Sequence, residues 1–400
     1  MQTRRNFTGP ALFSYGFRPF FLAATLFGLG VVPVWLLVWR GDLMPGGAMA
    51  PVDWHVHEMI FGYGAAVVAG VLFTAVPNWT GRMPARGWPL AVLLALWVAG
   101  RLAMAGAFGD DPVLVMCADG AFLLAVAGMI AREIVAGRNW RNLKVLVPVS
   151  LLAAANVFFH LEAMRTGLAE TGHRLGIALL VFLIMLIGGR IVPSFTRNWL
   201  ARSGSPSRPV PFGPYDVASL LAGGVALSGW VAVPDAPATG VALALAAVMH
   251  VVRLARWLGV LTVGAPLLVM LHIAYGFLPA GFAAAALGAF GWAGPDQAAH
   301  LFGIGGIGGM TLAVMMRATL GHTGRPLVAG PALTVGFVAV ALAALVRLYG
   351  ADTFFPGLDG IHLAALLWTA GFALAVRRLL PWLATPRMAP RRPGRASLRT

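Results

Sequence analysis

The residues best suited to chemistry in this sequence are its nine histidines. Neutral imidazole binds iron or copper through one ring nitrogen and offers the other to a supporting hydrogen bond. The stretch WHVHEMIFGYG (54–64) places His55 and His57 two residues apart, so on a continuous helix they would point about 200° away from each other and could not share an ion. We therefore expect the helix to begin between them, with His57 facing inward as a haem ligand and His55 turned toward another partner.

The other histidines are grouped by their place along apolar segments. Four lie at the segment ends that we expect on the outer side of the membrane: His160, His173, His300 and His362. Each of these four histidines is either a metal ligand or an interfacial side chain that reaches water. His250 and His272 lie near mid-membrane, where a core hydrogen bond, a metal or haem ligand and a proton relay are the alternatives. The candidate metal ligands are His55, His57, His173, His250, His272, His300 and His322.

Two charged residues accompany these histidines. Glu58 would orient an imidazole or carry protons, or it would be a solvated glutamate at a helix start, where it suits the helix dipole. Arg101 falls inside an apolar segment and must find an anion there. That anion is either Asp119 on the following segment, which we favour, or the propionate of a haem.

The segment HLFGIGGIGGMTLAVMMRATLGHTGR (300–325) contains G-x-G-x-x-G, but no strand precedes it, so a dinucleotide site is excluded. Small residues at this spacing admit either another helix or a flat macrocycle. Its methionines 310, 315 and 316 either pack or offer thioether sulfur. The single cysteine, Cys117, excludes a disulfide framework and is expected to be a small buried hydrophobe.

The elements that must position these residues are membrane helices. Of 400 residues, 59% are hydrophobic and only 11% are charged, well short of a soluble surface. Segments of about 20 apolar residues recur about twelve times, and in hydrocarbon they must be helical. We expect an all-α polytopic membrane protein with spans near 20–39, 57–77, 88–108, 112–131, 145–165, 173–193, 215–233, 238–259, 265–286, 298–317, 328–349 and 360–380.

The charge distribution predicts the orientation. The formal net charge is +15, but most of the 29 basic residues fall on one side of the spans and most of the 14 acidic residues on the other. This positive-inside bias predicts cytoplasmic termini and explains the charge without a nucleic-acid partner. We expect a cytoplasmic N-terminal segment (1–19), one transmembrane domain (20–380) of six plus six helices joined by loop 197–214, and a basic cytoplasmic tail (381–400) that rests on membrane lipid.

Five segments closely resemble the signature segments of the NnrS family and follow the same order: PALFSYGFRPFFLAA (10–24), WHVHEMIFGYGAAVVAGVLFTAVPNWTGR (54–82), IGGRIVPSFTRNWL (187–200), PLLVMLHIAYGFLP (266–279) and MMRATLGHTGRPL (315–327). The resemblance implies a bacterial inner-membrane protein of twelve helices that contains haem and copper, responds to nitric oxide in denitrifiers and protects from nitrosative stress. The family's histidine positions correspond to His55, His57, His272, His300 and His322.

A looser, fold-level similarity is to the large subunit of haem-copper oxidases, in which helices two and ten hold a haem. By this analogy His57 and His300 would be the axial ligands of a haem, taken to be b-type. His173, His250 or His272 would then bind copper or a second haem.

Three functions stay open at this stage. The first is a haem- and copper-binding protein that meets nitric oxide, with His55, His57, His272, His300 and Arg101 as the cofactor-binding residues. The second is a redox enzyme that turns over nitric oxide and needs an electron donor. The third is a proton or metal transporter without haem.

Overall fold

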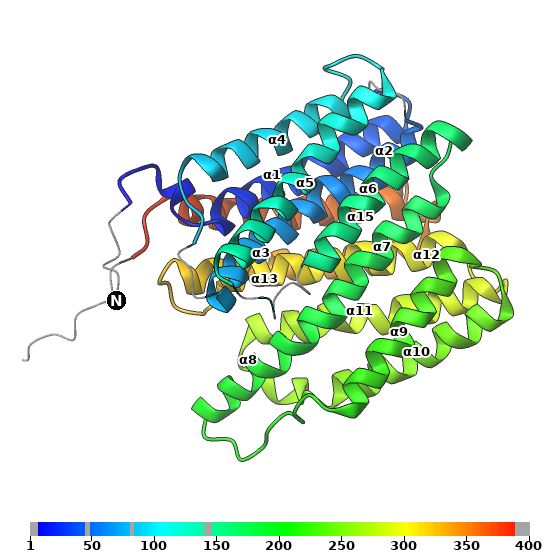
Figure 1. Ribbon diagram of the computed structural model, residues 1–400. Coiled ribbons are helices and arrows are strands. Elements are labelled where there is room, and N and C mark those ends of the chain that lie inside the picture. The colour runs from blue at the N-terminus through cyan, green and yellow to red at the C-terminus, as the bar shows by residue number, and fades with distance from the viewer. Residues whose placement is uncertain (1–6, 45–48, 81–83, 139, 141–145, 389–400) are drawn as a thin grey trace, which may run out of the picture.

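The computed structural model describes residues 7–388 apart from 45–48, 81–83, 139 and 141–145, and it consists almost entirely of helices (Figure 1). In this part of the chain eleven helices are long and apolar enough to cross a membrane, and α4 is a shorter apolar helix. The protein is therefore an all-α, multi-pass membrane protein, as predicted. Residues 389–400 of the expected basic tail lie outside the described residues.

The helices follow one another along the chain with short connections. The first half contains α1 (Phe17–Trp39), α2 (Pro51–His57), α3 (Ala65–Thr80), α4 (Trp88–Met104), α5 (Pro112–Ala136), α6 (Leu146–Thr166), α7 (Glu170–Leu183) and α8 (Gly189–Arg202). The second half contains α9 (Pro214–Ala232), α10 (Pro237–Ala255), α11 (Pro266–Ala289), α12 (Pro295–His300), α13 (Gly309–His322), α14 (Gly330–Val346) and α15 (Gly360–Ala384). A small antiparallel hairpin, β1 (Thr353–Phe355) with β2 (Leu358–Asp359), connects α14 to α15.

Three spans contain a π-helical turn, and these spans form the centre of the bundle. The turns are η2 (Glu58–Gly64) between α2 and α3, η4 (Ile184–Gly188) between α7 and α8, and η6 (Leu301–Gly308) between α12 and α13. These spans and α11 are 61–72% buried, against 33–39% for the other spans, so they are the least exposed to lipid. Such turns widen a helix locally and are frequent at functional sites.

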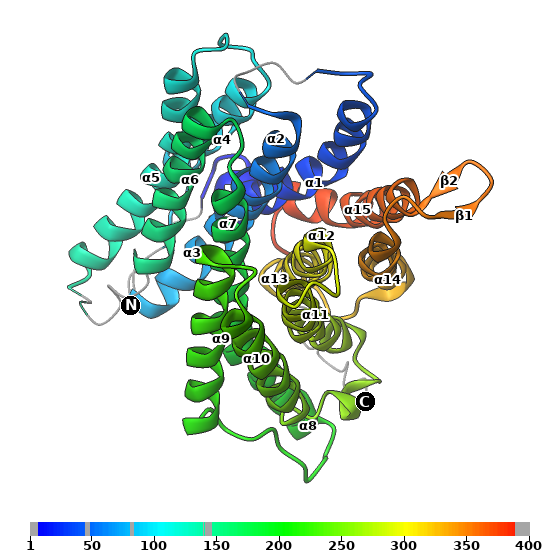
Figure 2. The same ribbon diagram turned by 90° about the vertical axis from the view of Figure 1, so that its right-hand side faces the viewer.

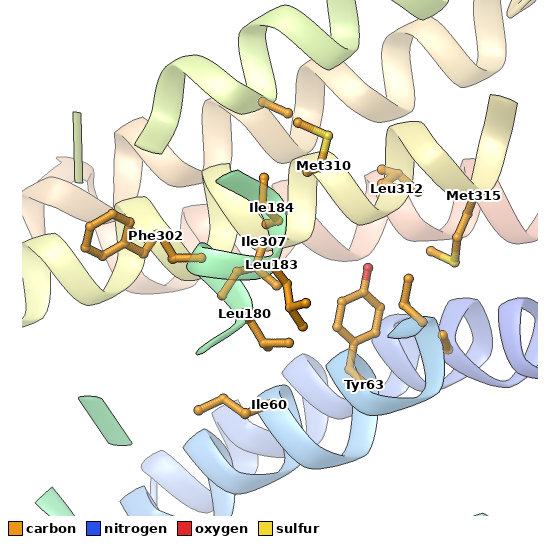
Figure 3. Close-up of a cluster of buried hydrophobic side chains, with 14 of the residues drawn as sticks. Ile60, Tyr63, Leu180, Leu183, Ile184, Phe302, Ile307, Met310, Leu312 and Met315 are labelled. Carbon is orange, nitrogen blue, oxygen red and sulfur yellow. The ribbon is translucent and has the colours of Figure 1, made fainter. Parts of the chain in front are cut away.

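The three interrupted spans meet in an apolar core (Figure 3). Ile60 and Tyr63 of η2 approach Leu183 and the side chains of η6 there, and the Tyr63 hydroxyl is 2.7 Å from Oγ1 of Thr311. Glycines make close packing possible, since a Cβ at Gly305 would lie 2.3 Å from the Phe277 ring. The glycine-rich segment therefore serves helix packing, and its methionines 310, 315 and 316 are buried in the core.

The first and last spans lie side by side, as both ribbon views show (Figure 2). Nη1 of Arg18, at the start of α1, donates to the carbonyl oxygens of Leu383 (2.9 Å) and Thr385 (2.6 Å) at the end of α15. The chain therefore enters and leaves the bundle at the same end.

Three details differ from expectation. The helix does not begin between His55 and His57, because α2 starts at Pro51, where a proline costs no helical hydrogen bond. Helix α8 continues to Arg202, so the joint between the two halves is shorter than 197–214. Cys117 is exposed on α5 instead of buried.

Candidate metal site

Four spans bring polar side chains together near one end of the bundle. His57 closes α2, Arg101 lies near the end of α4, Asp119 near the start of α5, and His160 near the end of α6. Each of these residues is within seven residues of the end of its helix on the side of the 105–111 loop. At 1.5 Å per residue, this depth is about 11 Å. Helix α5 packs against both α4 and α6, so its Asp119 is the common neighbour.

One ligand atom each from His57, Asp119 and His160 lies within 4.8 Å of the other two. Oδ2 of Asp119 is 3.1 Å from Nε2 of His57 and 3.3 Å from Nε2 of His160. The three side chains are at most 3% exposed. Two imidazoles and a carboxylate therefore converge on one enclosed point.

The hydrogen bonds of His57 determine which ring nitrogen is free. Its Nδ1 is 3.2 Å from Oε1 of Glu58, a carboxylate that only accepts, so Nδ1 carries the proton. In the neutral ring, Nε2 is then an acceptor. Its neighbour, Oδ2 of Asp119, is also an acceptor, and although the two atoms are close, Nε2 has no hydrogen-bond partner of acceptable geometry within the described residues.

Asp119 is held by its remaining neighbours. Nδ2 of Asn156 donates to Oδ2 at 2.7 Å, and the guanidinium of Arg101 donates both to Oδ1 of Asp119 and to Glu58. The favoured pairing of Arg101 with Asp119 is therefore confirmed. Glu58 also lies against an imidazole, as one of its two expected roles required.

The charges of this cluster do not cancel. Glu58 and Asp119 contribute two negative charges and Arg101 one positive charge, which leaves a net charge of −1 when both histidines are neutral. A buried net charge is strongly unfavourable. One further positive charge, a proton on His57 or a bound cation, would balance the cluster and also separate the two facing acceptor atoms.

The donor set fits a transition metal. Two imidazole nitrogens and one carboxylate oxygen suit copper, iron or zinc, once the proton that Nε2 of His160 donates to Asp119 has moved to Nδ1. Glu58 behind His57 supplies the supporting hydrogen bond that fixes the tautomer of a metal-binding histidine.

A second buried polar group lies between α9, α10 and α11. Nη1 of Arg253 and Nδ1 of His250 are each 2.9 Å from the Tyr275 hydroxyl, and Nε of Arg253 donates to Asp216 at 2.9 Å. Tyr275 accepts from Arg253, and it also shares a hydrogen bond with Nδ1 of His250. His250 thus has the core hydrogen bond that was one of its alternatives.

The remaining candidate histidines lie outside this cluster, although His55 is near enough to His300 and His173 to interact with them electrostatically. His55 points away from His57 and stacks on Trp35 with ring centroids 4.4 Å apart, and His173 is 2.6 Å from Asp53. His272 and His300 each donate from Nδ1 to the carbonyl four residues earlier. Nε2 of His300 is thus a potential ligand atom, whereas Nε2 of His272 lies 3.4 Å from Oγ1 of Thr196. Among the described residues His57 and His300 share no hydrogen bond, ion pair or ring contact, and their pairing about a haem stays a prediction.

His322 lies beside the N-terminal segment instead of in a polar site. Its ring is 5.8 Å from that of Tyr15 and 5.4 Å from that of Phe17. It packs with these aromatic rings at the end of the bundle where the chain enters and leaves.

Sequence reasoning missed His160 and Asn156 as site residues. They are four residues apart on α6 and therefore lie on one face of that helix, a signal that could have identified them.

The comparisons with known proteins agree with the resemblance seen in the motifs: the family model described as NnrS protein matches residues 11–387. No curated protein matches the chain.

Proposed function

The chain belongs to the NnrS family, which supports a role in the nitric oxide response, and we propose that it fulfils this role as a copper- and haem-binding protein that protects the cell from nitrosative stress. The observation that carries the metal proposal is the contact between Nε2 of His57 and Oδ2 of Asp119. Two acceptor atoms 3.1 Å apart in a buried site of net charge −1 are stable only with a positive charge between them.

We assign copper to His57, Asp119 and His160, and this assignment replaces the pairing of His57 with His300 about a haem. Cuprous copper binds nitric oxide, and as a monovalent cation it would neutralise the cluster. The protein's own part is to hold the ligands: Glu58 fixes the proton of His57 on Nδ1, while Arg101 and Asn156 orient Asp119. The surrounding spans exclude water and present an apolar path, through which a small uncharged gas can arrive from the lipid.

The haem part of the proposal is based on the family resemblance. A haem needs an imidazole with a free ring nitrogen, and His300 offers Nε2 because its Nδ1 donates to the Asp296 carbonyl at 2.7 Å. This fits the proposed ligand role of His300.

The proposed setting is the bacterial inner membrane, with both termini in the cytoplasm. Two observations support it: the chain enters and leaves the bundle at one end, and the basic residues are concentrated on the side of the termini. Reporter fusions after residue 388 and within the 105–111 loop test this orientation, because only the first should be active as a cytoplasmic reporter.

The metal assignment is tested by copper content. The protein, purified in mild detergent, is loaded with cuprous ion without oxygen and its copper is measured after dialysis against a competing chelator. We expect one strongly held ion in the natural protein and at least tenfold weaker retention in His57→Gln and His160→Gln. His362→Gln is the matched control, since His362 contacts Asp359 far from this cluster.

Unchanged copper retention in both site variants would reject the assignment. Optical spectra of the same samples report haem independently, and His300→Ala should weaken the Soret band while leaving the copper content unchanged. Following the loss of nitric oxide with and without an artificial electron donor then separates stoichiometric capture from turnover.

A further inference from the structure

A group of arginine and aromatic side chains lies where α8 and α13 end, at the end of the bundle that carries both termini. Phe195, Trp199 and Arg202 follow one another at spacings of four and three residues, so they lie on one face of α8. The guanidinium of Arg317, on α13, lies 4.0 Å from the centroid of the Phe195 ring. Arg202 is near enough to act electrostatically on Arg317.

The positive charges of this group have no acidic partner among the described residues. Within the part of the chain that the structure describes, neither Arg202 nor Arg317 has a hydrogen-bond acceptor or a carboxylate partner. Arg202 is exposed, whereas Arg317 is half-buried. Their like charges repel each other at the membrane boundary, and an anion beside them would relieve this repulsion.

Arg202 also lines a pocket of about 510 Å³, together with Trp199, Ser203 and Leu327. Arg317 does not line this pocket but neighbours it through Arg202. The lining of the pocket combines a cation with apolar and aromatic surface. This combination matches the headgroup region of a bilayer, where tryptophan side chains also concentrate.

We propose that Arg202 and Arg317, together with Trp199, bind the phosphate of an anionic phospholipid. The phosphate would accept hydrogen bonds from the two guanidinium groups, which are well suited to it. The acyl chains would lie against Trp199 and Leu327, the apolar side chains of the pocket. This lipid would stabilise the junction of two of the three π-containing spans, and the proposal is independent of the metal site.

Native mass spectrometry of the delipidated protein tests the proposal, with phosphatidylglycerol and phosphatidylcholine of the same chain length as probes. We expect phosphatidylglycerol to be retained preferentially, and about tenfold less in Arg202→Gln or Arg317→Gln. Arg317→Lys keeps the charge and should retain part of the preference, which distinguishes a lost ligand contact from misfolding. Arg132→Gln is the matched control, because Arg132 is exposed on α5, away from this pocket.

Equal retention of the two lipids, or a preference unchanged by both glutamine variants, would overturn the proposal. A third arm uses inorganic phosphate as competitor. Displacement of phosphatidylglycerol by millimolar phosphate would assign the pocket to a soluble phosphate and would also overturn the lipid assignment, whereas resistance to it supports the lipid.

Discussion

Nε2 of His57 and Oδ2 of Asp119 face each other 3.1 Å apart, one on α2 and the other on α5. Once Nδ1 of His57 donates to Glu58, both facing atoms are acceptors. The pair therefore needs a positive charge between its members. The charges of the surrounding residues should thus determine both the stability of this part of the bundle and its affinity for metal.

Replacing Asp119 by Asn tests the structural side of this dependence. The amide keeps the shape, its Nδ2 can donate to Nε2 of His57, and the charges of Glu58 and Arg101 then cancel. We expect a melting temperature in detergent at least equal to that of the metal-free natural protein, together with loss of copper retention. Adding Arg101→Gln leaves Glu58 as an unpaired buried charge and should cost about 3–5 kcal/mol. A clearly lower melting temperature of Asp119→Asn alone would contradict the charge argument.

Arg101 should determine whether the site prefers a monovalent or a divalent metal ion. With Arg101 present, a monovalent cation balances the net charge of −1, whereas in Arg101→Gln the net charge becomes −2 and a divalent cation fits better. Competition between cuprous ion and zinc, measured by metal content, should therefore shift toward zinc in this variant. Arg174→Gln is the control, since Arg174 makes only a long bond to a carbonyl oxygen. An unchanged metal preference would show that charge balance does not select the ion.

Much of the fold follows from the sequence because lipid imposes it. A chain that crosses a bilayer must satisfy its backbone within helices, so span number and approximate bounds could be predicted from apolar length alone. The start of α2 could not be found by asking which face His55 and His57 occupy, because the local signal was Pro51. The π-helical turns were also missed, although two of them coincide with the glycine-rich EMIFGYG and LFGIGGIG.

The candidate site was only partly predictable for a related reason. Spacing within a helix tells which side chains share a face, and the charge of Arg101 demanded a partner, so Arg101 and Asp119 could be paired. Which faces of different helices meet depends on packing between spans. From the sequence alone His160 is therefore an isolated residue at the end of a span, and the pairing of His57 with His300 rests on an analogy that contains no information on the neighbours of His57.

Gly62 should be intolerant of a side chain because of Arg101. A Cβ at Gly62 would lie 2.6 Å from Nη1 of Arg101 and 2.9 Å from the Phe27 ring, and Arg101 cannot retreat without releasing Glu58 and Asp119. We expect Gly62→Ala to destabilise the protein by about 1–3 kcal/mol and to weaken copper retention. Gly303→Ala, in the π-helical turn η6, is the control, since nothing lies within 4 Å of its added Cβ. If both variants unfold at the same temperature, the close packing at Gly62 has no energetic role.

Asp359 caps α15 and should make the start of this helix sensitive to acid. Slight burial acts to raise the pKa of Asp359, but hydrogen bonds from the backbone N–H and the ring of His362, both at 2.8 Å, hold that pKa below its ordinary value. A carboxyl with a lowered folded-state pKa contributes its full stabilisation above the unfolded value of about 3.9 and loses it as the pH falls through the folded value.

Hydrogen exchange at the first turn of α15 should thus show the same protection at pH 7 and pH 5 and less below pH 4, after correction for the intrinsic exchange rate. Asp359→Asn keeps a capping oxygen without the ionisable group and should remove this dependence, while Asp359→Ala should lose about 1 kcal/mol of local stability at pH 7 and show no further loss below pH 4. Persistence of the acid response in Asp359→Asn would assign it to another group.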